Sequence, residues 1–189
     1  VLAEATNVIA EGEVLQLVNM HDPDISVDDY LRVIEYKTAK LFEASTRLGA
    51  LISDASPEVE EACAAYGRAL GTSFQLIDDV LDYEGDAQEL GKNIGDDLRE
   101  GKTTLPLLIA MERATAEQRA LLRHAIEHGE QERLQEIVSI VRSTGALEST
   151  REAARAEARH ASECLQMLPR NKWTESLLEF AIQSVERHS

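Results

Sequence analysis

The chain has 189 residues, which is enough for one domain with a sizeable hydrophobic core. Its 19 basic and 35 acidic residues give a net charge of −16 without a visible basic face, which argues against nucleic acid and an anionic membrane surface as partners. No apolar run approaches the roughly 18 residues of a membrane-spanning helix, and no signal peptide is recognised.

Composition favours helices throughout. The chain is rich in Ala, Leu and Glu, with only four prolines and ten glycines, and it has neither a strand pattern nor an internal repeat. We therefore expect an all-α fold, a helical bundle. Cys63 and Cys164 lie far apart without a CxxC neighbour, so we expect free thiols in a reducing compartment rather than a zinc site or a disulfide framework.

The first helix is expected over residues 1–20, where apolar and small residues recur with a helical period. This period places Ala5, Gly12 and Val18 on an inward stripe. Pro23 cannot continue the helix and ends it. Because the chain begins inside this pattern, with neither an initiator Met nor an N-cap, we expect it to be a piece of a longer polypeptide.

A second long helix is expected over residues 27–52, with Ser26 as its N-cap. It carries Lys37 and Thr38. Lys37 falls on or near the apolar face of this helix, so two interpretations remain open: an ordinary lysine whose stem packs on apolar surface while its amine reaches water, or a lysine that binds an anion.

The third helix is expected over residues 57–83, starting at the pair Ser56-Pro57. Small residues such as Gly67 and Gly71 should let a neighbouring helix approach closely. The end of this helix carries the most informative stretch of the chain.

Three carboxylates, Asp78, Asp79 and Asp82, interrupt an apolar run in this helix. Together with Gln75 they form one polar stripe, because positions three or four apart share a helix face. Like charges at this spacing repel, and burying them unpaired is costly. A divalent cation relieves both problems, and hard oxygen ligands with room for water suit Mg²⁺. The alternative is a solvated acidic face, which the apolar flanks disfavour.

Residues 84–103 form a long connection with few apolar residues and several glycines, which is typical of lids and binding loops. Lys92 and Lys102 lie in it. Carboxylates followed by a flexible loop with lysines are what a metal-bridged diphosphate needs. Asp96 and Asp97 either add charge near the metal ions or cap a short helical turn.

The remainder of the chain contains no constellation of chemical groups, and its histidines are scattered, so we expect residues 107–189 to be a structural part that closes the bundle. In the last helix the inward residues are expected to be Trp173, Leu177, Phe180, Ala181 and Val185. The expected helices cover residues 105–112, 116–127, 130–144, 146–168 and 173–188.

The stretch FQLIDDVLDY (74–83), followed by GKNIGDDLREGKTTLP (91–106), resembles the second aspartate-rich motif of trans-polyprenyl diphosphate synthases and its continuation. EGEVLQL (11–17) and YKTAKLFEAS (36–45) match the GExxQ and KT helices of that family in the right order. The resemblance covers essentially the whole chain and points to bacterial long-chain synthases of the octaprenyl type, which make quinone side chains. It implies a class-I isoprenoid synthase fold, incomplete at the N-terminus.

This resemblance implies that isopentenyl diphosphate is condensed onto an allylic diphosphate with Mg²⁺, in a cytoplasmic homodimer. Asp78 is then a direct metal ligand, and Asp79 and Asp82 act on the metal directly or through water. These three aspartates and Lys37 are the implied catalytic residues. The residues implied to bind the diphosphate by charge or hydrogen bonds are Lys37, Lys92, Lys102, Thr38 and Gln75.

The family's first aspartate-rich motif and its isopentenyl diphosphate-binding residues are not among these 189 residues. We therefore expect residues 1–106 to form one half of an active site, with the missing N-terminal part of the same polypeptide as its partner, and the chain alone to be inactive. Two alternatives remain: a shorter-chain farnesyl or geranylgeranyl diphosphate synthase, and a non-catalytic partner subunit or truncation product. The intact aspartates and lysines disfavour the second.

Overall fold

The computed structural model describes residues 1–84, 94–129 and 132–187, and these residues contain helices and no strand, which confirms the all-α prediction. None of the described helices combines the length and the apolar character needed to cross a bilayer. The elements are α1 (Leu2–Asn19), α2 (Val27–Ile34), the π-helix η1 (Glu35–Ala39), α3 (Lys40–Ile52), α4 (Pro57–Glu84), α5 (Asp96–Arg99), α6 (Leu105–Arg113), α7 (Ala116–His128), α8 (Leu134–Ser143), α9 (Ala146–Cys164), the 3₁₀ turn η2 (Leu165–Met167) and α10 (Lys172–Val185).

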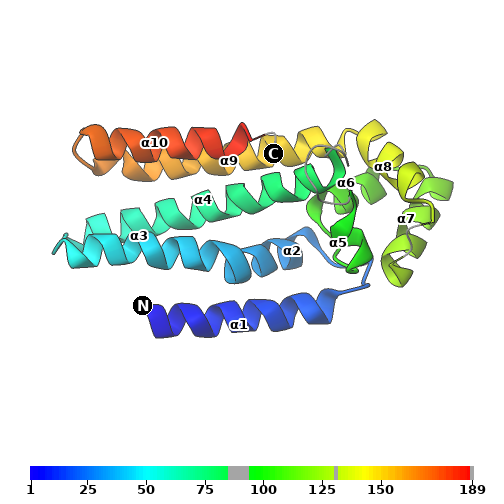
Figure 1. Cartoon of the computed structure of the whole chain (residues 1–189), viewed down its shortest axis with the longest axis horizontal. Helices are drawn as coiled ribbons and strands as arrows, with labels where there is room; N and C mark the ends of the chain where they lie inside the picture. Colours follow the sequence, from blue (N-terminus) through cyan, green and yellow to red (C-terminus); the bar gives the residue numbers. More distant parts are fainter. Residues whose placement is uncertain (85–93, 130–131, 188–189) are drawn as a thin grey trace.

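Helix α4 is the axis of the bundle, with α3 packed along one side and α9 along another. Figure 1 shows the long helices lying side by side, with α1 next to the α2–α3 rod, α10 next to α9, and α5 to α8 gathered at one end. The aspartate-rich end of α4 therefore lies at the end of the bundle where α1, α2 and the α5–α6 segment meet.

Helices pack closely where glycines face a neighbouring backbone. A Cβ atom added to Gly71 of α4 would lie 2.6 Å from the Cα atom of Ala39 in η1, which confirms the expected close helix approach near the motif. Helix α4 contributes several of the largest fully buried side chains, and α5 to α8 contribute others. These side chains include Tyr66, Leu76, Ile77 and Tyr83 of α4 and Leu98, Leu107, Leu122, Ile126 and Ile137.

The expected helix over residues 27–52 is present, but it contains a π-helical turn at Glu35–Ala39 between α2 and α3. A π turn inserts an extra residue into the helical ladder and changes which side chains point to a given face, and such turns are frequent at functional sites. Periodicity alone did not predict it, because the apolar pattern on both sides of the turn still reads as one helix.

Two inward stripes were predicted correctly only in part. In α1 only Ala5 and Gly12 are buried, while Val18 is 73% exposed. In α10, Ala181 is buried and Leu177 and Val185 pack against the core as predicted, but Trp173 is 69% and Phe180 is 52% exposed. The small buried residues of α10 are Thr174, Ala181 and Ser184.

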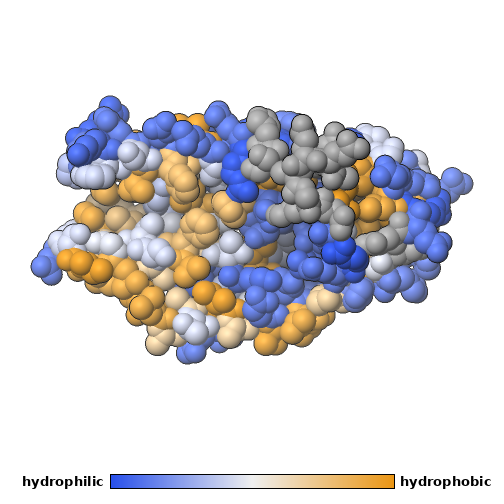
Figure 2. Space-filling view, viewed as in Figure 1, coloured by the Kyte–Doolittle hydropathy of each residue, from blue (hydrophilic) through white to orange (hydrophobic). Residues whose placement is uncertain are grey.

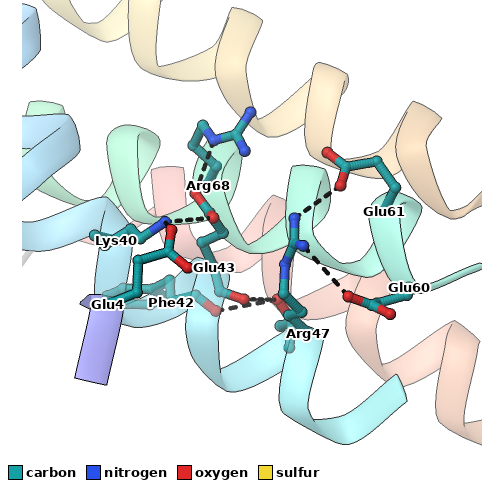
Figure 3. Close-up of polar contacts among 9 residues, drawn as sticks. Glu4, Lys40, Phe42, Glu43, Arg47, Glu60, Glu61 and Arg68 are labelled. Atoms are coloured by element: carbon teal, nitrogen blue, oxygen red, sulfur yellow. Dashed lines mark hydrogen bonds and ion pairs between the residues drawn. The ribbon is translucent and has the colours of Figure 1, made fainter. Parts of the chain in front are cut away.

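A polar network ties three helices together beside the apolar core (Figure 3). Glu43 of α3 is only 6% exposed, and it accepts hydrogen bonds from Lys40 Nζ at 2.8 Å and from Arg68 Nε of α4 at 2.9 Å. Lys40 also contacts Glu4 of α1 at 3.2 Å. The network fixes α1 and α4 against the segment that follows η1.

Candidate active site

A cavity of about 210 Å³ lies where α1, α2, η1, α4 and the α5–α6 segment meet. Six residues predicted to act in the site line it together: Lys37, Thr38, Gln75, Asp78, Asp79 and Lys102. The lining also contains residues that the sequence analysis did not assign, and the most polar of these are Gln16, Asn19, Tyr30, Asp97, Thr103 and Thr104.

The π-helical turn supplies both members of the KT pair to the cavity. Lys37 Nζ donates a hydrogen bond to Gln16 Oε1 of α1 at 2.9 Å and lies 3.2 Å from Glu13 Oε2. These partners explain the spacing of the EGEVLQL motif, because Glu13 and Gln16 sit on the face of α1 that meets η1. Lys37 is therefore held by α1 and lines the cavity, and its role in binding an anion stays a prediction.

A chain of hydrogen bonds crosses three elements on one side of the cavity. Tyr30 of α2 donates to Asp79 Oδ2 at 2.5 Å, and Gln75 Nε2 donates to Asp79 Oδ1 at 2.8 Å. Thr38 Oγ1 in turn donates to Gln75 Oε1 at 3.1 Å. Both oxygens of Asp79 are thus engaged by protein donors, and the side chain is only 2% exposed.

Asp79 is a buried carboxyl among other carboxyls. Its burial, together with the negative charge of Asp97, raises the pKa of Asp79 to about 8, although the hydrogen bonds from Tyr30 and Gln75 oppose the shift. Burial, with the nearby charge of Asp79, also raises the pKa of Tyr30 well above its ordinary value, so the phenol is the donor in this pair. The cavity therefore crowds carboxyl groups together, and a bound cation would favour their ionised forms.

Asp82 does not line the cavity. Its two oxygens accept hydrogen bonds from the backbone N–H groups of Asp96 at 3.1 Å and Asp97 at 3.3 Å, at the start of α5. Burial and then the charge of Asp97 raise the pKa of Asp82 to about 7. Asp82 thus anchors the α5 segment to α4, and its assignment as a metal ligand stays a prediction.

The cavity also holds a second lysine from the far side. Lys102 Nζ contacts Asp97 Oδ1 at 3.0 Å and Glu100 Oε2 at 2.8 Å. Burial alone would lower the pKa of Lys102, but these carboxylates raise it, so the amine is fully charged at neutral pH. Lys92 lies outside the described residues.

The carboxylates in the cavity fit a hard divalent cation that is bound mainly by other oxygens. In the described part of the chain, no three His, Cys, Asp or Glu side chains come together in a way that could hold a metal ion by themselves. Mg²⁺ commonly takes only one or two protein carboxylates and completes its octahedron with water and substrate phosphates. Asp78 and Asp79 both line the cavity, and their assignment as metal ligands stays a prediction.

The residues that the sequence analysis missed differ in the signal they offered. Gln16 stands in the EGEVLQL motif, so the resemblance could have assigned it. Asp97 was left between two roles, and the structure puts it both at the start of α5 and in the cavity lining. The sequence did not indicate a functional role for Tyr30, because an aromatic residue on the apolar face of a helix is usually part of the hydrophobic core.

Comparisons with known proteins all match this chain to polyprenyl synthases. A family model described as polyprenyl synthetase matches residues 1–142. Octaprenyl diphosphate synthase of Escherichia coli K12 is 51% identical over 188 residues, which is 99% of this chain and 58% of that protein. The corresponding enzyme of Haemophilus influenzae is 46% identical over 189 residues, or 57% of its length. The chain thus spans less than two thirds of the curated relatives it matches.

A solved structure agrees with these relatives. A polyprenyl synthase from Caulobacter crescentus CB15, described as complexed with calcium and isoprenyl diphosphate, superposes with a TM-score of 0.94 at 43% identity. The match covers 100% of this chain and 58% of that one. The predicted class-I isoprenoid synthase fold is confirmed by this likeness.

Proposed function

Because the chain belongs to the polyprenyl synthetase family, we propose that it carries the allylic diphosphate-binding part of a trans-prenyltransferase active site. The reaction condenses isopentenyl diphosphate onto an allylic diphosphate. The observation that carries the proposal is the shared cavity, in which the carboxylates Asp78 and Asp79 of α4 face Lys37 of η1 and Lys102 of the α5–α6 segment.

In this reaction the C1–O bond of the allylic diphosphate breaks, and the diphosphate leaves with the bonding electron pair. The double bond of isopentenyl diphosphate supplies the electrons of the new carbon–carbon bond, and a proton is then lost. Lys37 and Lys102 stabilise the negative charge that develops on the leaving group. Thr38 and Gln75 orient it by hydrogen bonds. When bound, Mg²⁺ would add further positive charge beside the oxygens of the leaving diphosphate. No side chain is assigned as the base, and the released diphosphate is the expected proton acceptor.

An octaprenyl product, used for quinone side chains, is the length that the relatives favour. Two relatives at 51% and 46% identity are octaprenyl diphosphate synthases, and a nonaprenyl diphosphate synthase of Rhodobacter capsulatus is 44% identical over 179 residues. A shorter product is less supported, since the geranylgeranyl pyrophosphate synthetase of Pyrococcus horikoshii is 30% identical. The six site residues gathered in the cavity argue against a degenerate, non-catalytic subunit.

Several further proposals rest on the family likeness: a homodimer, a cytoplasmic location, and the division into a half-site (1–106) and closing helices (107–189). Apolar side chains exposed over α1 and α3 support an interface on that face (Figure 2). They include Leu2, Val14, Leu17, Val18, Leu41 and Ile52. We also expect the 189 residues alone to be inactive, and turnover of allylic and isopentenyl diphosphates by the purified chain would refute that expectation.

The test of the function is a thermal melt with Mg²⁺ and a non-hydrolysable allylic diphosphate analogue. A ligand that binds only the native state stabilises it by about 2.7 kcal/mol at a hundredfold excess over its dissociation constant. We expect a shift in melting temperature that requires Mg²⁺ and disappears in Asp78→Ala. A shift that persists without metal or in the variant would contradict the proposed site, and the cooperative melt itself reports whether each protein is folded.

A further inference from the structure

We propose that Tyr30 is a positioning residue of the diphosphate site, whose hydroxyl fixes Asp79 and, through it, Gln75 and Thr38. The inference rests on the proposed function and adds a residue to it. Tyr30 is not expected to touch the reacting atoms. Its role is to determine which atoms of its neighbours face the substrate.

The geometry carries the first step. Tyr30 is 4% exposed and Asp79 is 2% exposed, and the phenol donates to Asp79 Oδ2 at 2.5 Å. When Asp79 is ionised, as a cation bound at the site would favour, its two oxygens can only accept hydrogen bonds, so each oxygen selects a donor. With Oδ2 taken by Tyr30, Oδ1 is left for Gln75, whose amide nitrogen lies 2.8 Å away.

The second step follows from the chemistry of the amide. Because Gln75 must present its nitrogen to Asp79, its oxygen must face Thr38, and Thr38 Oγ1 donates to that oxygen at 3.1 Å. The amide therefore has one orientation. One N–H of Gln75 is used by Asp79, and among the described residues no acceptor takes the other, which remains for a ligand oxygen in the cavity.

The third step is why the Tyr30 hydroxyl has a defined position. Ser26 caps α2 by accepting from the backbone N–H of Asp29, and Tyr30 begins the next turn, with its own N–H bonded to Ser26 O at 3.0 Å. The ring then lies in a cluster of buried apolar residues. The other buried members of this cluster are Ile34, Leu76, Ile77, Leu105 and Ala154.

A purely structural role would have the same static appearance, so the test needs a matched control. Tyr66 of α4 is also a buried residue, at 1% exposed, and its hydroxyl donates to Leu177 O at 2.8 Å. It does not line the cavity. Tyr30→Phe and Tyr66→Phe each delete one hydroxyl that hydrogen-bonds inside the protein. The first loses its bonds to Asp79 and to the backbone of Leu105, the second loses its bond to Leu177 O, and only the first deletion is at the site.

The experiment measures binding of inorganic pyrophosphate by calorimetry across a Mg²⁺ titration, in the natural gene product that contains these 189 residues. For Tyr30→Phe we expect the Mg²⁺ concentration giving half-maximal binding to rise about tenfold, the low end of the effect of residues that hold metal ligands. We expect Tyr66→Phe to match the unsubstituted protein. Both variants should lose a few degrees of melting temperature.

Each result decides the matter. If Tyr30→Phe binds Mg²⁺ and pyrophosphate as the unsubstituted protein does, or if Tyr66→Phe shows the same loss, the positioning role is wrong while the proposed function stands. If the unsubstituted protein neither binds pyrophosphate with Mg²⁺ nor turns over the two substrates, the proposed function fails and the inference fails with it. Recovery of Tyr30→Phe turnover at high Mg²⁺ is the further result that a positioning role predicts.

Discussion

Lys37 of η1 and Gln16 of α1 meet across the helix contact, with Lys37 Nζ donating to Gln16 Oε1 at 2.9 Å. This bond links two motifs that lie on separate helices. The bond also explains why a glutamine stands in the EGEVLQL motif. Its amide oxygen accepts the hydrogen bond from Lys37 without adding another charge beside Glu13.

If Gln16 acts through Lys37, its removal should matter only while the lysine is present. We expect Lys37→Met to weaken Mg²⁺-dependent pyrophosphate binding about tenfold or more, and Gln16→Leu to weaken it about fivefold, the equivalent of one hydrogen bond. In the double variant Gln16→Leu should add little. Calorimetric dissociation constants for the four proteins provide the measurement, and additive losses would contradict the coupling.

Gly12 lets α1 approach η1, since a Cβ atom there would lie 2.6 Å from the backbone nitrogen of Lys37. Gly12→Ala should therefore push the two helices apart, cost about 1–3 kcal/mol as an overpacked contact does, and weaken pyrophosphate binding by moving Lys37. Gly49→Ala is the control, because nothing lies within 4 Å of its Cβ position. That change should stabilise the helix by about 0.5–1 kcal/mol. Urea unfolding measures both, and equal effects would refute the argument.

The buried Glu43 should contribute to stability through its charge. Although its burial opposes ionisation, hydrogen bonds from Lys40 and Arg68 lower the pKa of Glu43 below its ordinary value. Glu43→Gln should cost about 1.5–3 kcal/mol at pH 7, as expected for charge-assisted hydrogen bonds. Because a lowered pKa stabilises the native state above the unfolded value, this cost should shrink as the pH falls toward 4. Urea unfolding at pH 7 and pH 4 checks both, and a cost that does not depend on pH would contradict it.

The sequence predicted most of the fold, because helix caps, prolines and glycines bound nearly every helix. The residue spacing and the family resemblance agree, and together they predicted that four residues act in one site: Lys37, Thr38, Gln75 and Asp78. The sequence did not predict that Asp82 turns to the backbone of α5, because that bond depends on how the chain returns after α4. Nor did it predict a site role for Tyr30, because the Tyr30 hydroxyl reaches Asp79 only when α2 packs against α4.

The metal-free protein should lose stability as the pH rises. Burial and the charge of Asp97 raise the pKa of Asp79 to about 8, far above the ordinary value of 3.8 that applies to the unfolded chain. Between these values the native state keeps a proton that the unfolded state has lost, so the free energy of unfolding should fall with pH, by up to about 1.4 kcal/mol per unit for this group. Asp82, with its pKa raised to about 7, acts in the same direction.

Urea unfolding in a chelator at pH 5 to 8 measures this dependence, and Asp79→Asn is the variant that isolates it. We expect the profile of the variant to be flatter than that of the unsubstituted protein, because an amide does not titrate. Adding Mg²⁺ should raise stability most at the upper end of the range, since a cation favours ionised carboxylates. If the two metal-free profiles ran parallel, Asp79 would be ionised in the native state throughout, and the cavity would already contain enough positive charge without a metal.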